Sequence, residues 1–289
     1  KVDVIFKNSS AFIEGEEVKI TQSKINHNIL EINNLYDLKK IVAKNFHSRY
    51  FNSIHKKDDH IIKISKNKEK LKDEFLFLKS IPENLKGFYA EVIDEKETSN
   101  QYEYTLQAYD MFDLGYQYIS GLMELDDIKG LFRVLEDLFS EVFKKNIESN
   151  GSELDDILNK NALRDKELKK LDIYTSLNSF MVNHAGISLS DHYLRIQSDL
   201  KNHKKVFKNS GKIFSHGDLC FSNMLFSPET LELKLIDPRG LNNSNGFRTP
   251  YYDMAKLSHS LLGNYDFIIN NLSKINFSEK MEASNKFNF

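Results

Sequence analysis

The chain has 289 residues, of which 28% are charged, and its formal net charge is −2. This length is enough for two lobes with a sizeable core. A charge near zero provides no global basic field, so neither nucleic acid nor a membrane surface is expected as a partner. Neither a bilayer-length apolar run nor an apolar signal core after the opening KVDVIF is present, and the single cysteine, Cys220, cannot form an internal disulfide. A cytoplasmic location is therefore expected.

Residues 1–46 are predicted to stand apart from the rest of the chain. The stretch 25–44, INHNILEINNLYDLKKIVAK, has Asn34 as a helix cap, followed by Leu35, Leu38 and Ile41 on one apolar face. It resembles the closing strand and helix of sugar nucleotidyltransferase domains. The segment is expected to be an N-terminal extension, or the tail of a fused or partner nucleotidyltransferase domain.

Residues 47–108 show the pattern of a small, sheet-rich lobe. Lys63 lies inside the alternating run HIIKIS, after the charged turn HKKDD, and a helical run is predicted to open at Glu74. Further on, QYEYTLQAYDM alternates as a strand does. No G-x-G-x-x-G motif occurs in the sequence, and the turn between Ile54 and Ile61, which is the candidate for covering a phosphate chain, contains no glycine.

Residues 109–289 are predicted to form a larger and mainly helical lobe. Apolar residues recur at helical spacing from Ile128 to Val142, which is typical of a core-facing helix. A second helix is predicted to begin with Ser152 as its cap. Two more are expected at about 168–181 and 190–200.

The most informative stretch is IFSHGDLCFSNMLFSPETLELKLIDPRG, residues 213–240. It sets His216 and Asp218 ahead of Asn223, and an alternating strand then leads to Asp237. Phosphoryl transfer from a nucleotide needs this set of groups. One acid takes the proton of the attacking hydroxyl, while an amide and a second acid hold the Mg²⁺ that bridges the phosphates.

This pattern, HGD-x4-N followed by a strand that ends in Asp, resembles the aminoglycoside phosphotransferase and choline kinase family, the small-molecule branch of the kinase fold. The resemblance covers residues from about 48 to 265. It implies that Asp218 is the general base, that Asn223 and Asp237 are Mg²⁺ ligands, and that His216 braces the loop. The later TPYYDMAKL implies that Asp253 receives hydrogen bonds from the loop.

The same resemblance assigns the nucleotide-binding groups. Lys63 is expected on the α and β phosphates, held by Glu74, with Glu69 as a rival partner. The end of the strand before residue 109 is expected to be the hinge, where main chain around Gln107 and Tyr109 contacts the adenine edge. ATP and Mg²⁺ are the implied cofactors.

We expect an α+β, two-lobed, protein-kinase-like fold with a small antiparallel-sheet lobe and a larger helical lobe. The expected activity is Mg²⁺-dependent transfer of the ATP γ-phosphoryl to a hydroxyl of a small metabolite, a sugar or amino alcohol used for surface polysaccharide. The alternatives are an aminoglycoside-type antibiotic kinase, a protein kinase, and a non-catalytic nucleotide-binding pseudokinase.

Overall fold

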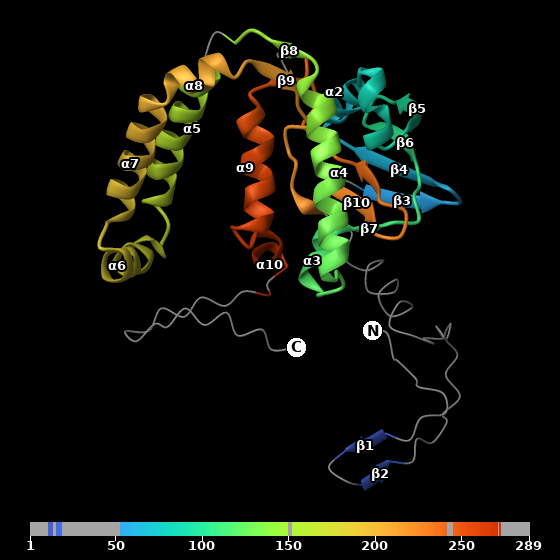
Figure 1. Cartoon of the computed structure of the whole chain (residues 1–289), viewed down its shortest axis with the longest axis horizontal. Helices are drawn as coiled ribbons and strands as arrows, with labels where there is room; N and C mark the ends of the chain where they lie inside the picture. The colour runs from blue at the N-terminus through green and yellow to red at the C-terminus, as the bar shows by residue number, and fades with distance from the viewer. Residues whose placement is uncertain are drawn as a thin grey trace. The chain divides into compact units, whose positions relative to one another are not determined.

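The structure is a computed structural model, and the chain divides into two units, Lys1–Tyr50 and Phe51–Phe289 (Figure 1). In the first unit, β1 (Ala11–Ile13) pairs antiparallel with β2 (Glu16–Val18). The predicted nucleotidyltransferase-like stretch 25–44 lies outside the described residues. These residues are 11–13, 16–18, 53–149, 152–241, 245–270 and 272.

A four-stranded antiparallel sheet opens the second unit, in the order β3-β4-β6-β5 (Figure 1). Its strands are β3 (Ser53–Lys57), β4 (His60–Ser65), β5 (Val92–Glu97) and β6 (Tyr102–Gln107). In β6 every second side chain is buried, because Tyr102, Tyr104 and Leu106 all point to the covered face. This is the alternation that the sequence predicts.

Helix α2 (Lys68–Lys79) packs beside this sheet (Figure 1). It begins at Lys68, so the prediction that the helical run opens at Glu74 is wrong. Asn67 caps the helix by accepting a hydrogen bond from the Lys70 amide at 3.2 Å. The first turns are mostly charged and bury only Leu71 before Glu74, so their apolar periodicity is weak.

The rest of the unit is mainly helical, as predicted. The helix predicted at about 168–181 begins only at Tyr174, because α5 continues to Leu168 and a turn separates the two. The elements are η1 (Glu83–Phe88), α3 (Leu114–Ile119), α4 (Leu125–Phe143), α5 (Ser152–Leu168), α6 (Tyr174–Ala185), α7 (Leu189–Asn202), α8 (Lys204–Asn209), η2 (Phe221–Asn223), α9 (Pro250–Leu261) and α10 (Tyr265–Ile269).

Two small antiparallel sheets frame the loop that carries the polar motif. Strand β9 lies between β12 and β8, and β10 lies between β11 and β7. The first sheet therefore leads into the loop and the second leads out of it. The strands are β7 (Phe112–Asp113), β8 (Asn146–Ile147), β9 (Lys212–Phe214), β10 (Met224–Ser227), β11 (Glu232–Leu235) and β12 (Phe247–Arg248).

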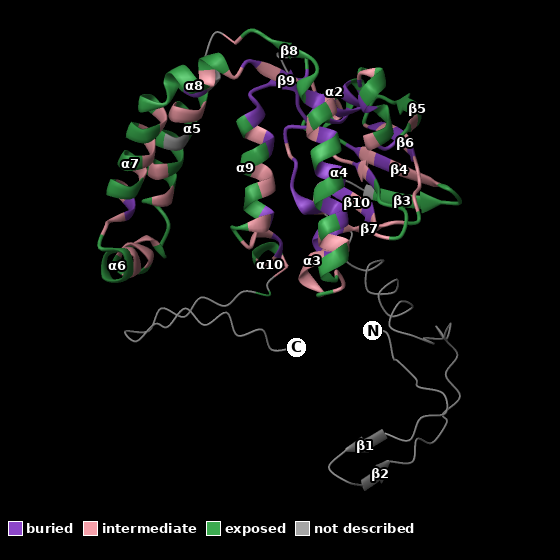
Figure 2. Cartoon of the chain, in the orientation of Figure 1, coloured by how far each residue is buried: buried purple, intermediate pink, exposed green. Residues whose placement is uncertain are grey.

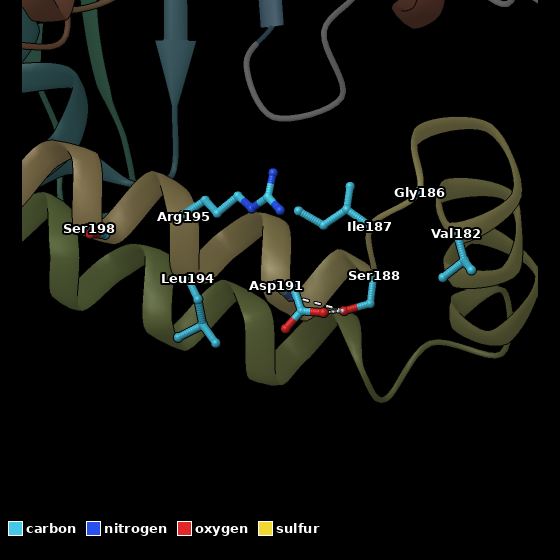
Figure 3. Close-up of a pocket in the computed structure, with 8 residues that line it drawn as sticks. All are labelled: Val182, Gly186, Ile187, Ser188, Asp191, Leu194, Arg195 and Ser198. Atoms are coloured by element: carbon cyan, nitrogen blue, oxygen red, sulfur yellow. Dashed lines mark hydrogen bonds between the residues drawn. The ribbon is translucent and has the colours of Figure 1, made fainter.

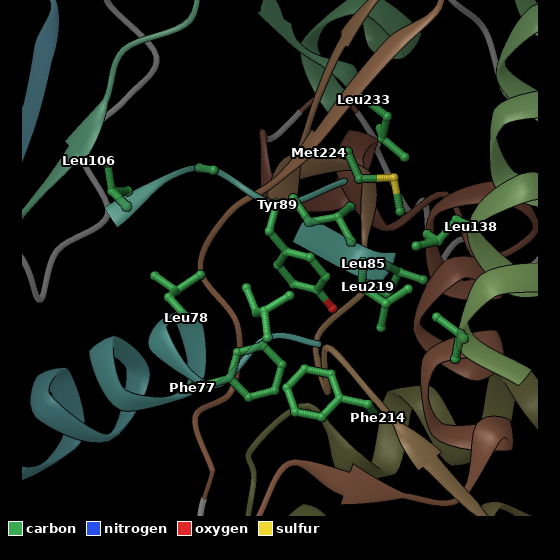
Figure 4. Close-up of a cluster of buried hydrophobic side chains, with 14 of the residues drawn as sticks. Phe77, Leu78, Leu85, Tyr89, Leu106, Leu138, Phe214, Leu219, Met224 and Leu233 are labelled. Atoms are coloured by element: carbon green, nitrogen blue, oxygen red, sulfur yellow. The ribbon is translucent and has the colours of Figure 1, made fainter. Parts of the chain in front are cut away.

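One apolar core connects α2 to the strands around the loop (Figures 2 and 4). The Phe77 ring of α2 stacks on Phe214 of β9 with centroids 4.7 Å apart, and it also contacts Tyr89 at 5.9 Å. Each such aromatic contact adds about 0.5–1.5 kcal/mol beyond the burial of area. Helix α2 is thereby packed directly against the strand that enters the loop.

The predicted α+β class, with an antiparallel sheet first and helices after it, is confirmed. The lobe boundary at residues 108 and 109 stays a prediction. Among the described residues, no helix combines the length and the apolar character required to cross a bilayer.

Candidate functional site

Lys63 joins the sheet, the helix α2 and the end of the polar motif. Its ammonium donates a hydrogen bond to the Glu74 carboxylate and lies 2.9 Å from Oδ1 of Asp237. The Tyr104 hydroxyl donates to the same Glu74 carboxylate. The structure therefore contains the predicted pair of Lys63 with Glu74, and Glu69 is not the partner. Because Lys63 is only 3% exposed, its charge is balanced by these two carboxylates rather than by water.

Burial and the neighbouring carboxylates shift the pKa of Lys63 in opposite directions. Burial alone would lower the pKa of its ammonium, but the carboxylates of Asp237 and Glu74 outweigh that effect and raise the pKa. Burial also raises the pKa of Glu74, and the charge of the Lys63 ammonium opposes that rise. Lys63 and Glu74 thus each stabilise the charged form of the other.

His216 is buried inside the loop between β9 and β10. Its Nε2 lies 2.9 Å from the carbonyl oxygen of Ile236, and its Nδ1 accepts a hydrogen bond from the Asp218 amide at 3.2 Å. These contacts assign the neutral tautomer with the proton on Nε2. Burial lowers the pKa of His216, which agrees with a neutral ring. Tyr89 stacks on the ring at a centroid distance of 6.0 Å. The His216 ring thus contacts both Asp218 and Ile236, and its bracing role stays a prediction.

Asp253, in the first turn of α9, supports the loop from behind. Its Oδ2 accepts hydrogen bonds from the Ser215 hydroxyl at 2.8 Å and the His216 amide at 2.9 Å, and its Oδ1 accepts from the Gly217 amide at 2.7 Å. Burial raises the pKa of Asp253, and these donors oppose that rise. The hydrogen bonds implied for Asp253 by the family resemblance are therefore present.

Gly217 and Arg248 set the shape of the same loop. Gly217 has φ +78°, and a Cβ at this position would lie 2.8 Å from Cβ of Arg239. The Arg248 guanidinium donates to the carbonyl oxygen of Ser215 at 2.9 Å and also to that of Gly240. The backbone before Asp218 is thus fixed by buried polar contacts on both sides.

Asp218 itself stays partly open to solvent. Its side chain is 32% exposed, and Oδ1 lies 2.9 Å from the ammonium of Lys256 on α9. The Asp218 carbonyl oxygen accepts a hydrogen bond from Nδ2 of Asn223 at 2.8 Å. The predicted base is therefore accessible, while its main chain is held in place.

Asn223 and Asp237 lie at the same end of the β10–β11 hairpin. Met224 pairs with Leu235, and the Ile236 amide donates to the Asn223 carbonyl oxygen at 3.0 Å, so Asp237 follows one residue later. Asp237 has φ +57°, a conformation that is uncommon for residues other than glycine and that concentrates at functional sites. The hairpin thus brings together the two residues predicted to bind a metal.

The Asn223 side chain has an unused acceptor. The residue is fully buried, its Nδ2 is hydrogen-bonded, and its Oδ1 has no hydrogen-bond partner among the described residues. Amide and carboxylate oxygens are ligands that Mg²⁺ accepts. The donor set therefore fits this ion.

A site built on these two residues needs other ligands. In the described ranges, no group of three or more His, Cys, Asp or Glu side chains is arranged to hold a metal ion. Mg²⁺ usually takes only one or two protein ligands and keeps waters and substrate phosphates for the rest. The Asp237 carboxylate and the Asn223 amide would supply two protein ligands, which agrees with this preference of Mg²⁺.

Gln107 and Tyr109 lie where β6 ends. The Gln107 amide donates to the carbonyl oxygen of Glu91 at 2.9 Å, and the Ala108 amide donates to that of Asp59 at 2.8 Å. The Tyr109 hydroxyl accepts from the Glu91 amide at 3.2 Å. The amides of Gln107 and Ala108 are therefore already engaged, so an adenine edge would have to be met by other main-chain groups near Tyr109.

The β3–β4 turn lies at this same end of the sheet. Lys57 pairs with His60, so the turn consists of Asp58 and Asp59, and Asp58 has φ +52°. Lys63 follows His60, the first residue of β4 after the turn, by three positions. At the usual rise of a strand it therefore lies about 10 Å from the turn. The expectation that this turn covers the phosphates held by Lys63 is therefore not supported, because the turn is tied to the end of β6.

The sequence interpretation missed Lys256 and Arg248. Lys256 follows Asp253 by three residues on α9, and residues at this spacing share a helix face. Once Asp253 is tied to the loop, the same face must present Lys256 to it, so that spacing was the available signal. Arg248 carries no comparable signal, because its partners are carbonyl groups that any residue type provides.

Two hollows lie on the helical part of the second unit. One, of about 620 Å³, is found between the end of α6 and α7, where Arg195 and Asp191 lie near Ile187 (Figure 3). The other, of about 420 Å³, is an apolar groove between α4 and α9 that includes Phe139 and Leu257. None of the predicted site residues lines either hollow.

Comparison with known proteins gives only distant structural similarity. No protein-family model and no curated protein matches the chain. Nothing in the comparisons supports the nucleotidyltransferase resemblance. One similar solved structure is a thermostable mutant of aminoglycoside phosphotransferase APH(4)-Ia in its apo form, with 10% identity and a TM-score of 0.41 over 81% of this chain and 83% of that chain. Another is a thermostable mutant of the same enzyme in a ternary complex with ADP and hygromycin B, with 9% identity and a TM-score of 0.40 over 76% of this chain and 75% of that chain.

Proposed function

We propose that this chain is a phosphotransferase that moves the γ-phosphoryl group of ATP to a hydroxyl of a small molecule. Lys63, held by Glu74, contacts the phosphates. Asp218 accepts the proton of the attacking hydroxyl, and Asn223 and Asp237 hold Mg²⁺. When bound, this ion neutralises charge on the phosphates and orients them for in-line transfer.

The amide oxygen of Asn223 is the observation that carries this proposal. A buried polar atom without a partner costs about 1–3 kcal/mol, so such an atom calls for an explanation. Asp237 leaves the same hairpin end and contacts the lysine of the sheet at 2.9 Å. A cation bound between the Asn223 amide and the Asp237 carboxylate would satisfy the acceptor and would lie next to the group that holds the phosphates.

The class of acceptor that we propose follows from the family resemblance. We propose a sugar or an amino alcohol, whose hydroxyl could reach the carboxylate of Asp218 because that side chain is 32% exposed. A small acceptor also agrees with a chain that lacks a strong overall charge.

Nucleotide binding is the first test. Thermal unfolding is measured with ATP alone, Mg²⁺ alone and both together. A ligand at about 100 times its Kd stabilises the folded state by about 2.7 kcal/mol, so ATP with Mg²⁺ should raise Tm clearly above either component alone. Identical transitions in all three conditions would contradict the proposal.

Product formation is the second test. Sugars, amino alcohols and aminoglycosides are incubated with the protein and Mg²⁺·ATP, and phosphorylated products are detected by mass spectrometry. The matched control is Asp218→Asn, which should lower kcat by roughly 10² to 10⁴ while nucleotide binding survives. Phosphorylation confined to aminoglycosides would identify an antibiotic kinase. Binding without any product would instead favour a non-catalytic nucleotide binder.

A further inference from the structure

A lysine outside the loop contacts the proposed base. The Lys256 ammonium of α9 lies 2.9 Å from Oδ1 of Asp218, and the two side chains are 29% and 32% exposed. Its position relative to the loop is well defined, because Asp253, one turn earlier on the same helix, accepts three hydrogen bonds from residues 215–217. The contact is therefore built by the helix and is not a chance encounter of two surface chains.

The loop supplies no positive charge of its own. The segment from His216 to Asn223, HGDLCFSN, contains neither lysine nor arginine. Two other cations nearby are committed elsewhere, because Lys63 is bound to Glu74 and Asp237, and Arg248 is bound to loop carbonyl groups. Within the described part of the chain, the Lys256 ammonium lies in ion-pair contact with the Asp218 carboxylate.

Phosphoryl transfer creates a need for such a cation. The base carboxylate and the γ-phosphoryl group are both anionic, and the acceptor hydroxyl has to sit between them, so they repel one another at short range. A lysine has three donors that rotate on a flexible stem. The partly exposed ammonium of Lys256 can therefore contact an oxygen of the transferring phosphoryl group while it stays close to the Asp218 carboxylate.

We propose that Lys256 is a catalytic residue that contacts the transferring phosphoryl group and also holds Asp218 through Oδ1. This inference rests on the proposed function. The acceptor hydroxyl gives its proton to Oδ2 of Asp218, and its oxygen forms the new bond to the γ-phosphorus. The bond from the γ-phosphorus to the bridging oxygen breaks, and its electron pair leaves with ADP. Lys256 offsets negative charge throughout and exchanges no proton.

The test needs no acceptor. Affinities for Mg²⁺·ADP are measured by calorimetry with and without aluminium fluoride, which mimics the phosphoryl group in the transition state of the transfer. In the wild type, aluminium fluoride should tighten binding. Lys256→Met should lose about tenfold or more of that gain, because a charge-assisted hydrogen bond is removed, while its affinity for Mg²⁺·ADP alone stays unchanged. Lys256→Arg should restore most of the gain.

Lys129→Met is the control, since Lys129 is an exposed lysine that pairs with Asp126 of the same helix. It should keep the full gain. An equal gain in Lys256→Met and the wild type would overturn the inference and leave the proposed function standing. If the wild type itself fails to bind Mg²⁺·ADP, the proposed function fails and this inference falls with it.

Discussion

The Lys63 ammonium lies 2.9 Å from the Asp237 carboxylate, although the two residues are 174 positions apart in the chain. The same ammonium is bound to Glu74 of α2. One buried cation therefore joins the four-stranded sheet, helix α2 and the hairpin that carries Asn223. Any change at Lys63 should affect both folding stability and the proposed chemistry, and the two effects can be separated.

Replacing Lys63 by methionine should destabilise the fold strongly. Removal of one partner from a buried ion pair costs about 3–5 kcal/mol, because the remaining charge is left uncompensated. Urea unfolding measures this loss. The control Lys129→Met removes only an exposed pair on α4 and should be nearly neutral. Equal midpoints for the two variants would contradict the structural role of Lys63.

A second substitution separates folding from function. In Lys63→Met with Glu74→Leu, the buried cation and its buried partner are both replaced by apolar groups, so part of the lost stability should return, although the Tyr104 hydroxyl loses its acceptor. Phosphoryl transfer should not return, because the phosphates have lost their ammonium. Recovery of activity in the double variant would show that Lys63 acts only as a structural group.

Asp237→Asn should remove the dependence of nucleotide binding on Mg²⁺. The substitution keeps the size of the side chain but takes away the charge that a divalent cation needs. Calorimetric titration with ATP in the presence and absence of Mg²⁺ measures the difference. Asp126→Asn, at an exposed position on α4, is the matched control and should keep the wild-type response. A full Mg²⁺ response in Asp237→Asn would rule out the proposed ligand.

The sequence predicts those parts of the site that are linked by short-range structure. Asn223 and Asp237 flank two alternating runs, and a hairpin between such runs must bring its outer ends together. Lys63 could be placed because its neighbours Ile62 and Ile64 show the period of a strand. In both cases local periodicity fixes which side chains share an end or a face of a sheet.

Other features depend on tertiary packing and leave little trace in local patterns. The stack of Phe77 on Phe214 joins α2 to β9, and no spacing rule connects two such distant rings. The first turns of α2 are charged and bury little, so apolar periodicity alone places the start of the helix too late, although the cap Asn67 marks the correct position. The Lys256 contact follows only once Asp253 is known to hold the loop.

Gly217→Ala should impair both stability and activity. The left-handed conformation costs a residue with a Cβ roughly 1–2 kcal/mol, and the new methyl group would also lie 2.8 Å from Cβ of Arg239. Gly186→Ala is the matched control, because Gly186 has φ +64° and nothing within 4 Å of an added Cβ. It should show the conformational cost alone and keep activity. Equal Tm values and equal turnover in the two variants would show that close packing at Gly217 is unimportant.

Acidification should destabilise the protein through His216. Burial holds the pKa of this histidine below its ordinary value of 6.5, although the carboxylates of Asp253, Asp218 and Asp237 act in the opposite direction. The unfolded chain therefore binds a proton more readily than the folded one. The stability contributed by the neutral ring is complete above pH 6.5 and is lost as the pH falls from there toward the folded pKa.

Calorimetric scans between about pH 5.5 and pH 7.5 should show this dependence, with a slope that approaches about 1.4 kcal/mol per pH unit for a single proton. His216→Gln should lower Tm but flatten the slope, because the amide can still donate to the Ile236 carbonyl oxygen and does not titrate. His192→Gln, at an exposed position on α7, should leave the slope unchanged. A slope that persists in His216→Gln and disappears in His192→Gln would assign the acid sensitivity to the surface and not to the histidine that supports the loop.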